Sequence, residues 1–134
     1  MRCKQRNIAT VFNYHCMKAF FNRLIFSLQG LAAFFSKETN GQIQLVIAVL
    51  VVIAGFVLHI NNTEWIAVLA AIALVLSLEM VNSAIEKLCD RLHPDWHASI
   101  KFIKDVAAGA VLWAAIFSAI IGLIIFLPKV LALI

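Results

Sequence analysis

Five polar side chains follow a long apolar run near the middle of the chain. Glu79, Asn82, Ser83, Glu86 and Asp90 recur at intervals of three and four residues, so a helix places them on one face. Carboxylate and amide oxygens can bind a divalent cation, and a carboxylate can also take up a proton. An acid within an apolar helix is costly unless it faces a protein interior or a polar cavity, so Glu79 is a candidate functional residue.

Charged residues that could act together lie at the ends of three apolar segments. Glu38 precedes one apolar run, Glu79 and Glu86 end another, and Lys104 precedes a third. This set suits a divalent cation with a phosphate chain, because Mg²⁺ takes one or two carboxylates and fills its shell with phosphate oxygens. The alternative is an ordinary helix end, at which the carboxylates meet water and pair with basic neighbours such as Lys87.

The composition is that of an integral membrane protein. Of the 134 residues, 63% are hydrophobic and only 13% are charged, whereas a soluble domain is ~25% charged. The net charge of +4 could indicate a nucleic-acid partner. The basic residues flank apolar segments, however, so they are better explained by membrane topology, and we expect no nucleic acid. We expect an all-α membrane protein with one small domain.

The chain divides into a short tail, residues 1–16, and one membrane domain, residues 17–134. Residues 17–37 carry apolar side chains at intervals of three and four, which predicts an amphipathic helix on the membrane surface. A signal peptide is the rival interpretation. Arg23 and Gln29 interrupt its apolar centre, and no A-x-A cleavage site follows, so we disfavour it.

Three segments are apolar enough to predict membrane spans. We place these spans at 43–60, 65–92 and 106–127. The apolar part of the second span is too short to cross ~30 Å of hydrocarbon, so its helix must continue past Glu79. Pro94 is expected to end this helix and Pro128 to close the third.

The distribution of Lys and Arg predicts the orientation. Basic residues concentrate before the first span and between the second and third, and the connection between the first two spans has none. Because positive charge is retained in the cytoplasm, the N-terminus and the second connection are expected inside. The carboxylates, except Glu64, would then lie at the cytoplasmic face of a multi-pass protein.

Several motifs together resemble one family. These are EMVNSAIE at 79–86, Asp90-Arg91, KDVAAGAVL at 104–112, and Glu38 with Asn40. They resemble the prokaryotic diacylglycerol kinase and undecaprenol kinase family, whose signature is E-x-x-N-[ST]-A-I-E followed by A-K-D-x-A-A-G-A-V-L, with an E-x-N element before the first span. The resemblance extends from about Phe20 to Lys129.

The resemblance implies a homotrimer with three membrane helices and one surface helix in each subunit. It implies a lipid kinase of the bacterial inner membrane that transfers the ATP γ-phosphate to a lipid hydroxyl. The acceptor would be diacylglycerol, giving phosphatidic acid, or undecaprenol, giving undecaprenyl phosphate. The sequence leaves these two lipids open.

Roles follow position by position from the same resemblance. Glu79 looks like the general base beside the lipid hydroxyl. Glu38 and Glu86 look like ligands of a Mg²⁺ ion that accompanies ATP. Asn82 looks like a residue that positions the phosphates. No G-x-x-x-x-G-K-[ST] loop is found, so the chain is not a P-loop kinase.

The resemblance also implies that Lys104 binds the phosphates of ATP and that Asp90 and Asp105 support ATP binding.

The sequence departs from the family after the E-x-N element. Gly41 and Gln42 stand where relatives often have an aromatic and a basic residue. This departure predicts a weaker nucleotide contact near Gln42.

Three other functions would fit parts of the sequence: a transporter, a non-catalytic scaffold and a zinc-binding protein. A small transporter could use Glu79 for proton coupling, but the acids gather at one face rather than along a path. A non-catalytic membrane scaffold would tolerate the loss of Glu79. Cys89, His93 and His97 have spacing that could indicate zinc, but Pro94 disrupts the helix between the histidines and no fourth ligand is evident.

Overall fold

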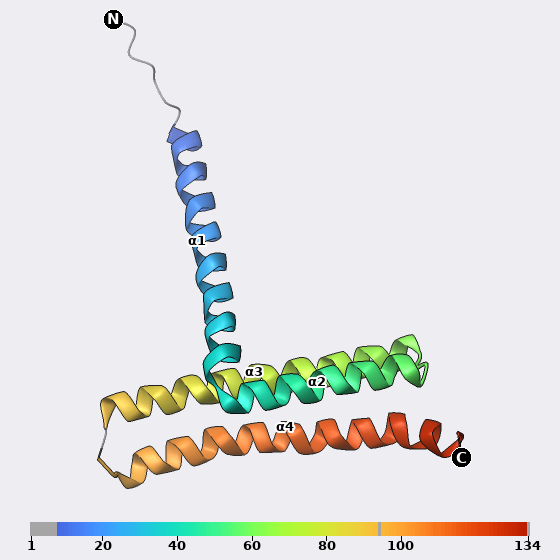
Figure 1. The fold of residues 1–134 in the computed structure, drawn as a ribbon. Coiled ribbons are helices and arrows are strands. Elements are labelled where there is room, and N and C mark those ends of the chain that lie inside the picture. The colour runs from blue at the N-terminus through green and yellow to red at the C-terminus, as the bar shows by residue number, and fades with distance from the viewer. Residues whose placement is uncertain (1–7, 94, 134) are drawn as a thin grey trace, which may run out of the picture. The chain divides into compact units, whose positions relative to one another are not determined.

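The computed structural model describes residues 8–93 and 95–133. These residues form four α-helices and no strand, which confirms the all-α prediction (Figure 1). The helices are α1 (Ile8–Lys37), α2 (Thr39–Val57), α3 (Asn62–Leu92) and α4 (Ala98–Leu131).

The chain separates into two compact units, the first ending at Lys37 and the second beginning at Glu38. The first unit is the single helix α1. It begins at Ile8 rather than at Met17, where the surface helix was expected to start. The sequence offers a reason, because neither proline nor glycine interrupts the residues from Ile8 to Gln29.

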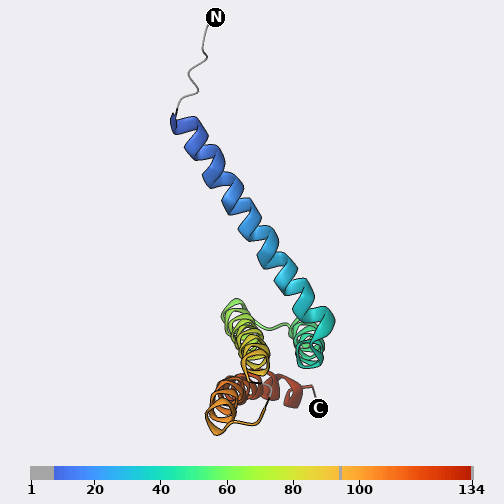
Figure 2. The same ribbon diagram turned by 90° about the vertical axis from the view of Figure 1, so that its left-hand side faces the viewer.

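The second unit is a bundle of α2, α3 and α4, which run side by side and alternate in direction (Figures 1 and 2). α3 makes most of its contacts with α4 and fewer with α2. We call the end with the α2–α3 connection the turn end. The opposite end, which contains Glu38 and Asp90, is the site end.

α2 ends earlier than the predicted span, at Val57 instead of Ile60. The Ile60 amide donates to the Gly55 carbonyl at 3.1 Å, and the His59 amide donates to the Phe56 carbonyl at 3.3 Å. This pair of bonds is the Schellman arrangement. It requires a left-handed residue, and His59, with φ of 48°, occupies that position without being glycine.

α3 begins with a capping box at the turn end. Asn61 Oδ1 accepts from the Glu64 amide at 3.0 Å, and Glu64 Oε2 accepts from the Asn61 amide at 2.7 Å. Lys129 of α4 also pairs with Glu64 Oε2 at 3.1 Å. The cap thus starts α3 and ties it to the last turn of α4.

α3 ends at Leu92 with His93 as its cap, as the following proline predicted. α4 begins at Ala98, well before the predicted 106, because His97 Nδ1 accepts from the Ser99 amide at 3.2 Å and caps it. Lys101 and Lys104 therefore lie on a helix, although both precede the predicted start of the third span. Hydropathy marks where a helix meets hydrocarbon, and a capped helix can continue beyond it.

Pro128 was expected to close the last helix, and that prediction is wrong, because α4 continues to Leu131. Proline removes one amide donor and its ring crowds the preceding turn, which costs stability without always ending a helix. The next turn still forms, since the Ala132 amide donates to the Pro128 carbonyl at 3.1 Å.

The apolar core lies toward the turn end. Ile60, Val68 and Ile125 form its buried cluster. Gly55 allows α2 and Trp65 to approach, because a Cβ atom at Gly55 would lie 2.8 Å from Trp65 Cη2. Larger residues than glycine do not fit between these helices without a shift.

Four helical segments are long and apolar enough to cross a membrane, judged by length and composition within the described residues. They are Met17–Lys37, Thr39–Val57, Asn62–Leu92 and Ala98–Leu131. Asn62–Leu92 and Ala98–Leu131 contain the predicted spans 65–92 and 106–127, and Thr39–Val57 covers the predicted span 43–60 except for its last three residues. The assignment of 17–37 to the membrane surface stays a prediction.

Candidate functional site at one end of the bundle

Glu79, Asn82 and Ser83 are buried, with exposures of 3%, 5% and 8%. They are the only buried polar residues in the part of the chain that the structure describes, and all three lie on α3. Glu79 Oε1 is enclosed and has no hydrogen-bond partner among the described residues. A buried oxygen without a partner costs free energy, so its retention suits a site that receives a ligand.

Asn82 lies one turn further along α3 and is hydrogen-bonded to Glu86. Its Nδ2 donates to Glu86 Oε1 at 3.1 Å, across the i,i+4 spacing. Its Oδ1 is buried and, within residues 8–93 and 95–133, has no partner. The amide therefore orients the Glu86 carboxylate and presents a free acceptor beside it.

Glu38 is the N-cap residue of α2, with an extended backbone, and its carbonyl accepts the first helical bond from the Gln42 amide at 3.0 Å. Its side chain does not cap the helix. Instead Glu38 Oε1 forms an ion pair with Lys87 of α3. Since Lys87 follows Glu86, the ion pair places Glu38 and Glu86 at the same level of the bundle.

The sequence analysis named Lys87 only under the alternative of an ordinary helix end, at which carboxylates pair with basic neighbours. The ion pair between Lys87 and Glu38 agrees with that alternative. Glu79 lies on the same helix but is buried, so no charge pair accounts for it. The site end thus combines an ordinary surface ion pair with a carboxylate that has none.

The charged residues of α4 enter the same end. Lys104 Nζ lies 2.9 Å from Asp90 Oδ1, which joins α4 to the last turns of α3. Asp105 pairs with Lys101 one turn before it on α4. The structure therefore brings Lys104 to Asp90, whereas Asp105 is engaged locally with a lysine to which sequence reasoning gave no role.

The side chains of the described residues do not by themselves form a metal site. Among the described residues, no three His, Cys, Asp or Glu side chains gather closely enough to hold a metal ion. Cys89 is buried, and the rings of His93 and His97 are stacked with centroids 5.9 Å apart. A Cys89–His93–His97 zinc site is therefore not formed. A site with two carboxylates and external phosphate ligands remains compatible with the arrangement.

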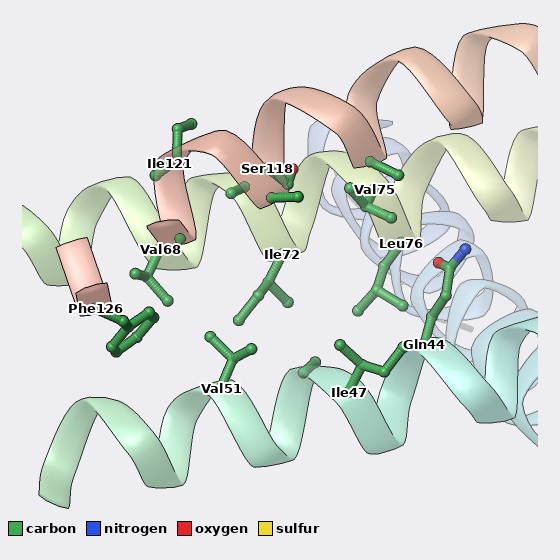
Figure 3. A pocket seen from close by; sticks show the side chains of 15 residues that line it. Gln44, Ile47, Val51, Val68, Ile72, Val75, Leu76, Ser118, Ile121 and Phe126 are labelled. Atoms are coloured by element: carbon green, nitrogen blue, oxygen red, sulfur yellow. The ribbon is translucent and has the colours of Figure 1, made fainter. Parts of the chain in front are cut away.

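A cavity of about 450 Å³ lies between α2, α3 and α4 (Figure 3). Its walls are almost entirely apolar. Gln44 on α2 and Ser118 on α4 are the exceptions. Gln44 Oε1 is buried without a partner in the described part of the molecule. Sequence reasoning missed Gln44, although a single amide inside an otherwise apolar span was a visible signal.

Comparison with known proteins places these features in a family. Residues 25–126 match the prokaryotic diacylglycerol kinase family. The undecaprenol kinase of Bacillus subtilis (strain 168) is 37% identical over 113 residues, which cover 84% of this chain and 92% of that protein. The diacylglycerol kinase of Haemophilus influenzae is 30% identical over 107 residues, covering 78% and 91%.

A third relative is the diacylglycerol kinase of Synechocystis sp., 38% identical over 106 residues. That match covers 78% of this chain and 60% of the relative. The matched regions include every candidate site residue on α2, α3 and the start of α4. With its apolar helices and its acidic site end, the chain belongs to the prokaryotic diacylglycerol kinase family and is a membrane protein.

Proposed function

We propose that this chain is a lipid kinase that transfers the γ-phosphate of ATP to the hydroxyl of a membrane lipid. The observation that carries the proposal is the buried carboxylate of Glu79, whose Oε1 has no partner among the described residues, between the apolar part of α3 and its charged end. A lipid hydroxyl arrives from the apolar side and ATP from the aqueous side. Membership of the family, and relatives named for diacylglycerol and undecaprenol, support this assignment.

In the proposed reaction, Glu79 accepts the proton of the lipid hydroxyl as the hydroxyl oxygen attacks the γ-phosphorus of ATP. The bond from that phosphorus to the bridging oxygen breaks, and ADP leaves. Phosphoryl transfer requires in-line positioning and charge stabilisation more than covalent catalysis. Asn82, hydrogen-bonded to Glu86, is placed to orient the phosphates through its free Oδ1 or by way of Glu86.

Glu38 and Glu86 are the residues that would hold Mg²⁺. The donor set fits, because Mg²⁺ binds one or two carboxylates and completes its shell with phosphate and water oxygens. The free Asn82 Oδ1 adds one neutral oxygen nearby. When bound, the ion supplies charge neutralisation to the phosphate chain. Lys87 pairs with Glu38 and so keeps that carboxylate at the site end.

Lys104 is proposed to contact the phosphates, with Asp90 and Asp105 supporting nucleotide binding. Asp90 holds the Lys104 ammonium at 2.9 Å and so keeps it at the site end. Asp105 forms an ion pair with Lys101, one turn before it on α4. Gly41 and Gln42 leave this part of α2 without the aromatic and basic contacts that relatives often have, so ATP binding is expected to depend more on Lys104.

The membrane arrangement is part of the proposal. α2, α3 and α4 span the bacterial inner membrane, residues 17–37 lie on its cytoplasmic surface, and the site end faces the cytoplasm. The concentration of Lys and Arg near that end supports this orientation. The assembly is proposed to be a homotrimer, as expected for the family.

The test is an assay of purified protein in mixed micelles with Mg-ATP, offering diacylglycerol and undecaprenol separately. Phosphorylation of either lipid establishes the kinase and names its acceptor. The transporter and scaffold alternatives predict no phosphorylated lipid from either acceptor. Transfer that is unchanged in a Glu79→Gln variant would remove Glu79 as the base.

A further inference from the structure

Lys87 is a charged residue of the site end that takes no part in the proposed reaction. It follows Glu86, one of the two proposed metal ligands, directly in the sequence. Its ammonium pairs with Glu38 Oε1 of the other proposed ligand. Among the ion pairs formed by the described residues, this is the one that joins α2 to α3. A single lysine is thus next to one carboxylate in the chain and next to the other in space.

The Glu38 carboxylate is directed to α3 rather than to its own helix. Glu38 is the N-cap residue of α2, and an acidic side chain at that position commonly accepts from the first amides of the helix. Here the side chain makes no such bond, so Lys87 is its partner. The Glu38 side chain is 23% exposed and the Lys87 side chain 63% exposed. The pair therefore lies where an ion from water can reach it.

The Glu86 carboxylate has a neutral partner. Asn82 Nδ2 donates to its Oε1 at 3.1 Å, and in the part of the chain that the structure describes no Lys or Arg forms an ion pair with Glu86. Two carboxylates at the same level of the bundle repel each other unless a cation lies near them. Lys87 supplies one positive charge to this pair, and a divalent ion would supply two.

We propose that Lys87 is an internal counter-ion of the metal site, whose ammonium competes with Mg²⁺ for the Glu38 carboxylate. The inference rests on the proposed function, because it takes Glu38 and Glu86 as the ligands of the ion. The ammonium repels a second cation at the same carboxylate, so it weakens binding of the metal alone. The ion then binds well only together with the phosphate chain of ATP, whose negative charges offset that repulsion. Lys87 is therefore a positioning residue that acts through Glu38.

The alternative is an ion pair that contributes only to stability. Lys87 lies in the last two turns of α3, and the helix dipole favours basic residues near the C-terminal end of a helix. The two explanations make opposite predictions for metal affinity. Removal of a competing cation raises the affinity, whereas removal of a residue that merely holds Glu38 in place lowers it or leaves it unchanged.

The direct test measures metal binding without turnover. The full-length protein in detergent, without ATP or lipid, is titrated with Mn²⁺ as the probe, and free Mn²⁺ is followed by electron paramagnetic resonance. Lys87→Met removes the ammonium and keeps an unbranched side chain. We expect the Kd for Mn²⁺ to fall about three- to tenfold, because one unit of charge no longer repels the divalent ion.

Lys101→Met is the matched control. The Lys101 side chain is 61% exposed and pairs with Asp105, which is not a proposed ligand of the ion. This variant removes the same charge from the same end of the bundle. Its Kd for Mn²⁺ should stay within about twofold of the parent value, because salt screens charges that are not in contact. An equal gain in affinity for both variants would show a general effect of net charge and would overturn the competition.

Lys87→Arg is the conservative variant. Arginine keeps the positive charge and can pair with a carboxylate, so Lys87→Arg should bind Mn²⁺ as the parent protein does. Unchanged or weaker Mn²⁺ binding in Lys87→Met, or no binding by that variant at millimolar Mn²⁺, would overturn the proposal. A higher KM for ATP with unchanged Mn²⁺ affinity would also overturn it, and would make Lys87 a contact of the nucleotide instead.

The lipid phosphorylation assay separates failure of this inference from failure of the kinase proposal. Phosphorylation of lipid by the parent protein, with no gain in Mn²⁺ affinity in Lys87→Met, would retain the reaction and refute the competition. A gain in Mn²⁺ affinity confined to Lys87→Met, without phosphorylation of diacylglycerol or undecaprenol, would retain the competition and refute the reaction.

Discussion

The two ends of α3 use the same residue types in opposite ways. At the turn end Asn61 and Glu64 bond to each other's backbone, and Lys129 neutralises the carboxylate. At the site end Asn82 and Glu79 are buried more deeply, yet each retains an oxygen without a partner in the described structure. The comparison shows that residue type does not separate a structural carboxylate from a functional one, whereas the completeness of its hydrogen bonds does.

Packing also differs along α3. Near the turn end Gly55 and Trp65 lie in close contact, and Ile60, Val68 and Ile125 form a buried cluster. An apolar cavity adjoins this cluster, since Val68 belongs to both, and it extends along α2 as far as Gln44. The buried polar residues of α3 lie beyond the residues that line this cavity.

The largest expected effect separates the two glutamates. Glu79→Gln removes the proposed base and should lower kcat by about 10²–10⁴-fold, with ATP binding and the oligomer retained. Glu64→Gln at the turn end should leave kcat within about twofold, because its role is structural. Lipid phosphorylation in mixed micelles measures both variants. Similar losses of activity in the two would erase the distinction between the ends.

The next effect concerns the metal ligands. Glu38→Ala or Glu86→Ala should raise KM for Mg-ATP about tenfold or more, because a charge-assisted contact is worth about 1.5–3 kcal/mol. A titration of rate against Mg²⁺ at fixed ATP should show partial recovery at high Mg²⁺. If the Mg²⁺ dependence of both variants matches that of the parent protein, the ligand assignment is wrong.

The packing of the turn end is tested by glycine substitution. Gly55→Ala places a Cβ atom 2.8 Å from Trp65 Cη2, and overpacking of this kind costs about 1–3 kcal/mol. The expected result is a lower Tm in detergent with kcat unchanged in the surviving protein. Gly30→Ala is the matched control, because no heavy atom of the described residues lies within 4 Å of its added Cβ. An equal fall in Tm for both variants would show that the loss of stability does not come from the contact with Trp65.

The smallest expected effect compares the two asparagines. Asn61→Ala removes the cap of α3 and should cost about 0.5–2 kcal/mol of stability, with little change in kcat. Asn82→Ala should instead lower kcat and leave Tm nearly unchanged, since its one bond to Glu86 is local. Thermal unfolding and lipid phosphorylation measured on both variants give the comparison. Reversed results would show that Asn82 is structural.

Much of the site was predictable from local sequence. The i,i+3 and i,i+4 spacing of Glu79, Asn82 and Glu86 placed them on one face of one helix, and the structure confirms that Glu79 and Asn82 are buried there. The position before proline predicted the end of α3 at Leu92. Helical periodicity and proline geometry act within a few residues, so a single sequence contains them.

Helix ends were predicted less well where tertiary or capping contacts decide them. α2 stops at Val57 because the Ile60 amide turns back to Gly55, although Ile60 is apolar enough to continue a span. α4 starts at Ala98 because the His97 side chain caps it, although charged residues follow. Hydropathy reports contact with hydrocarbon, and it does not report these hydrogen bonds.

The sequence by itself determined the helical class, the presence of segments apolar enough to cross a membrane, the acidic face of α3 and the family. These follow from composition, period and motif, which are local properties of the chain. Only the tertiary structure decided that Lys87 pairs with Glu38, that Lys104 meets Asp90, and that Gln44 Oε1 and Glu79 Oε1 are buried without a hydrogen-bond donor among the described residues. Those relations depend on the register of separate helices, which is set by packing between residues far apart in the chain.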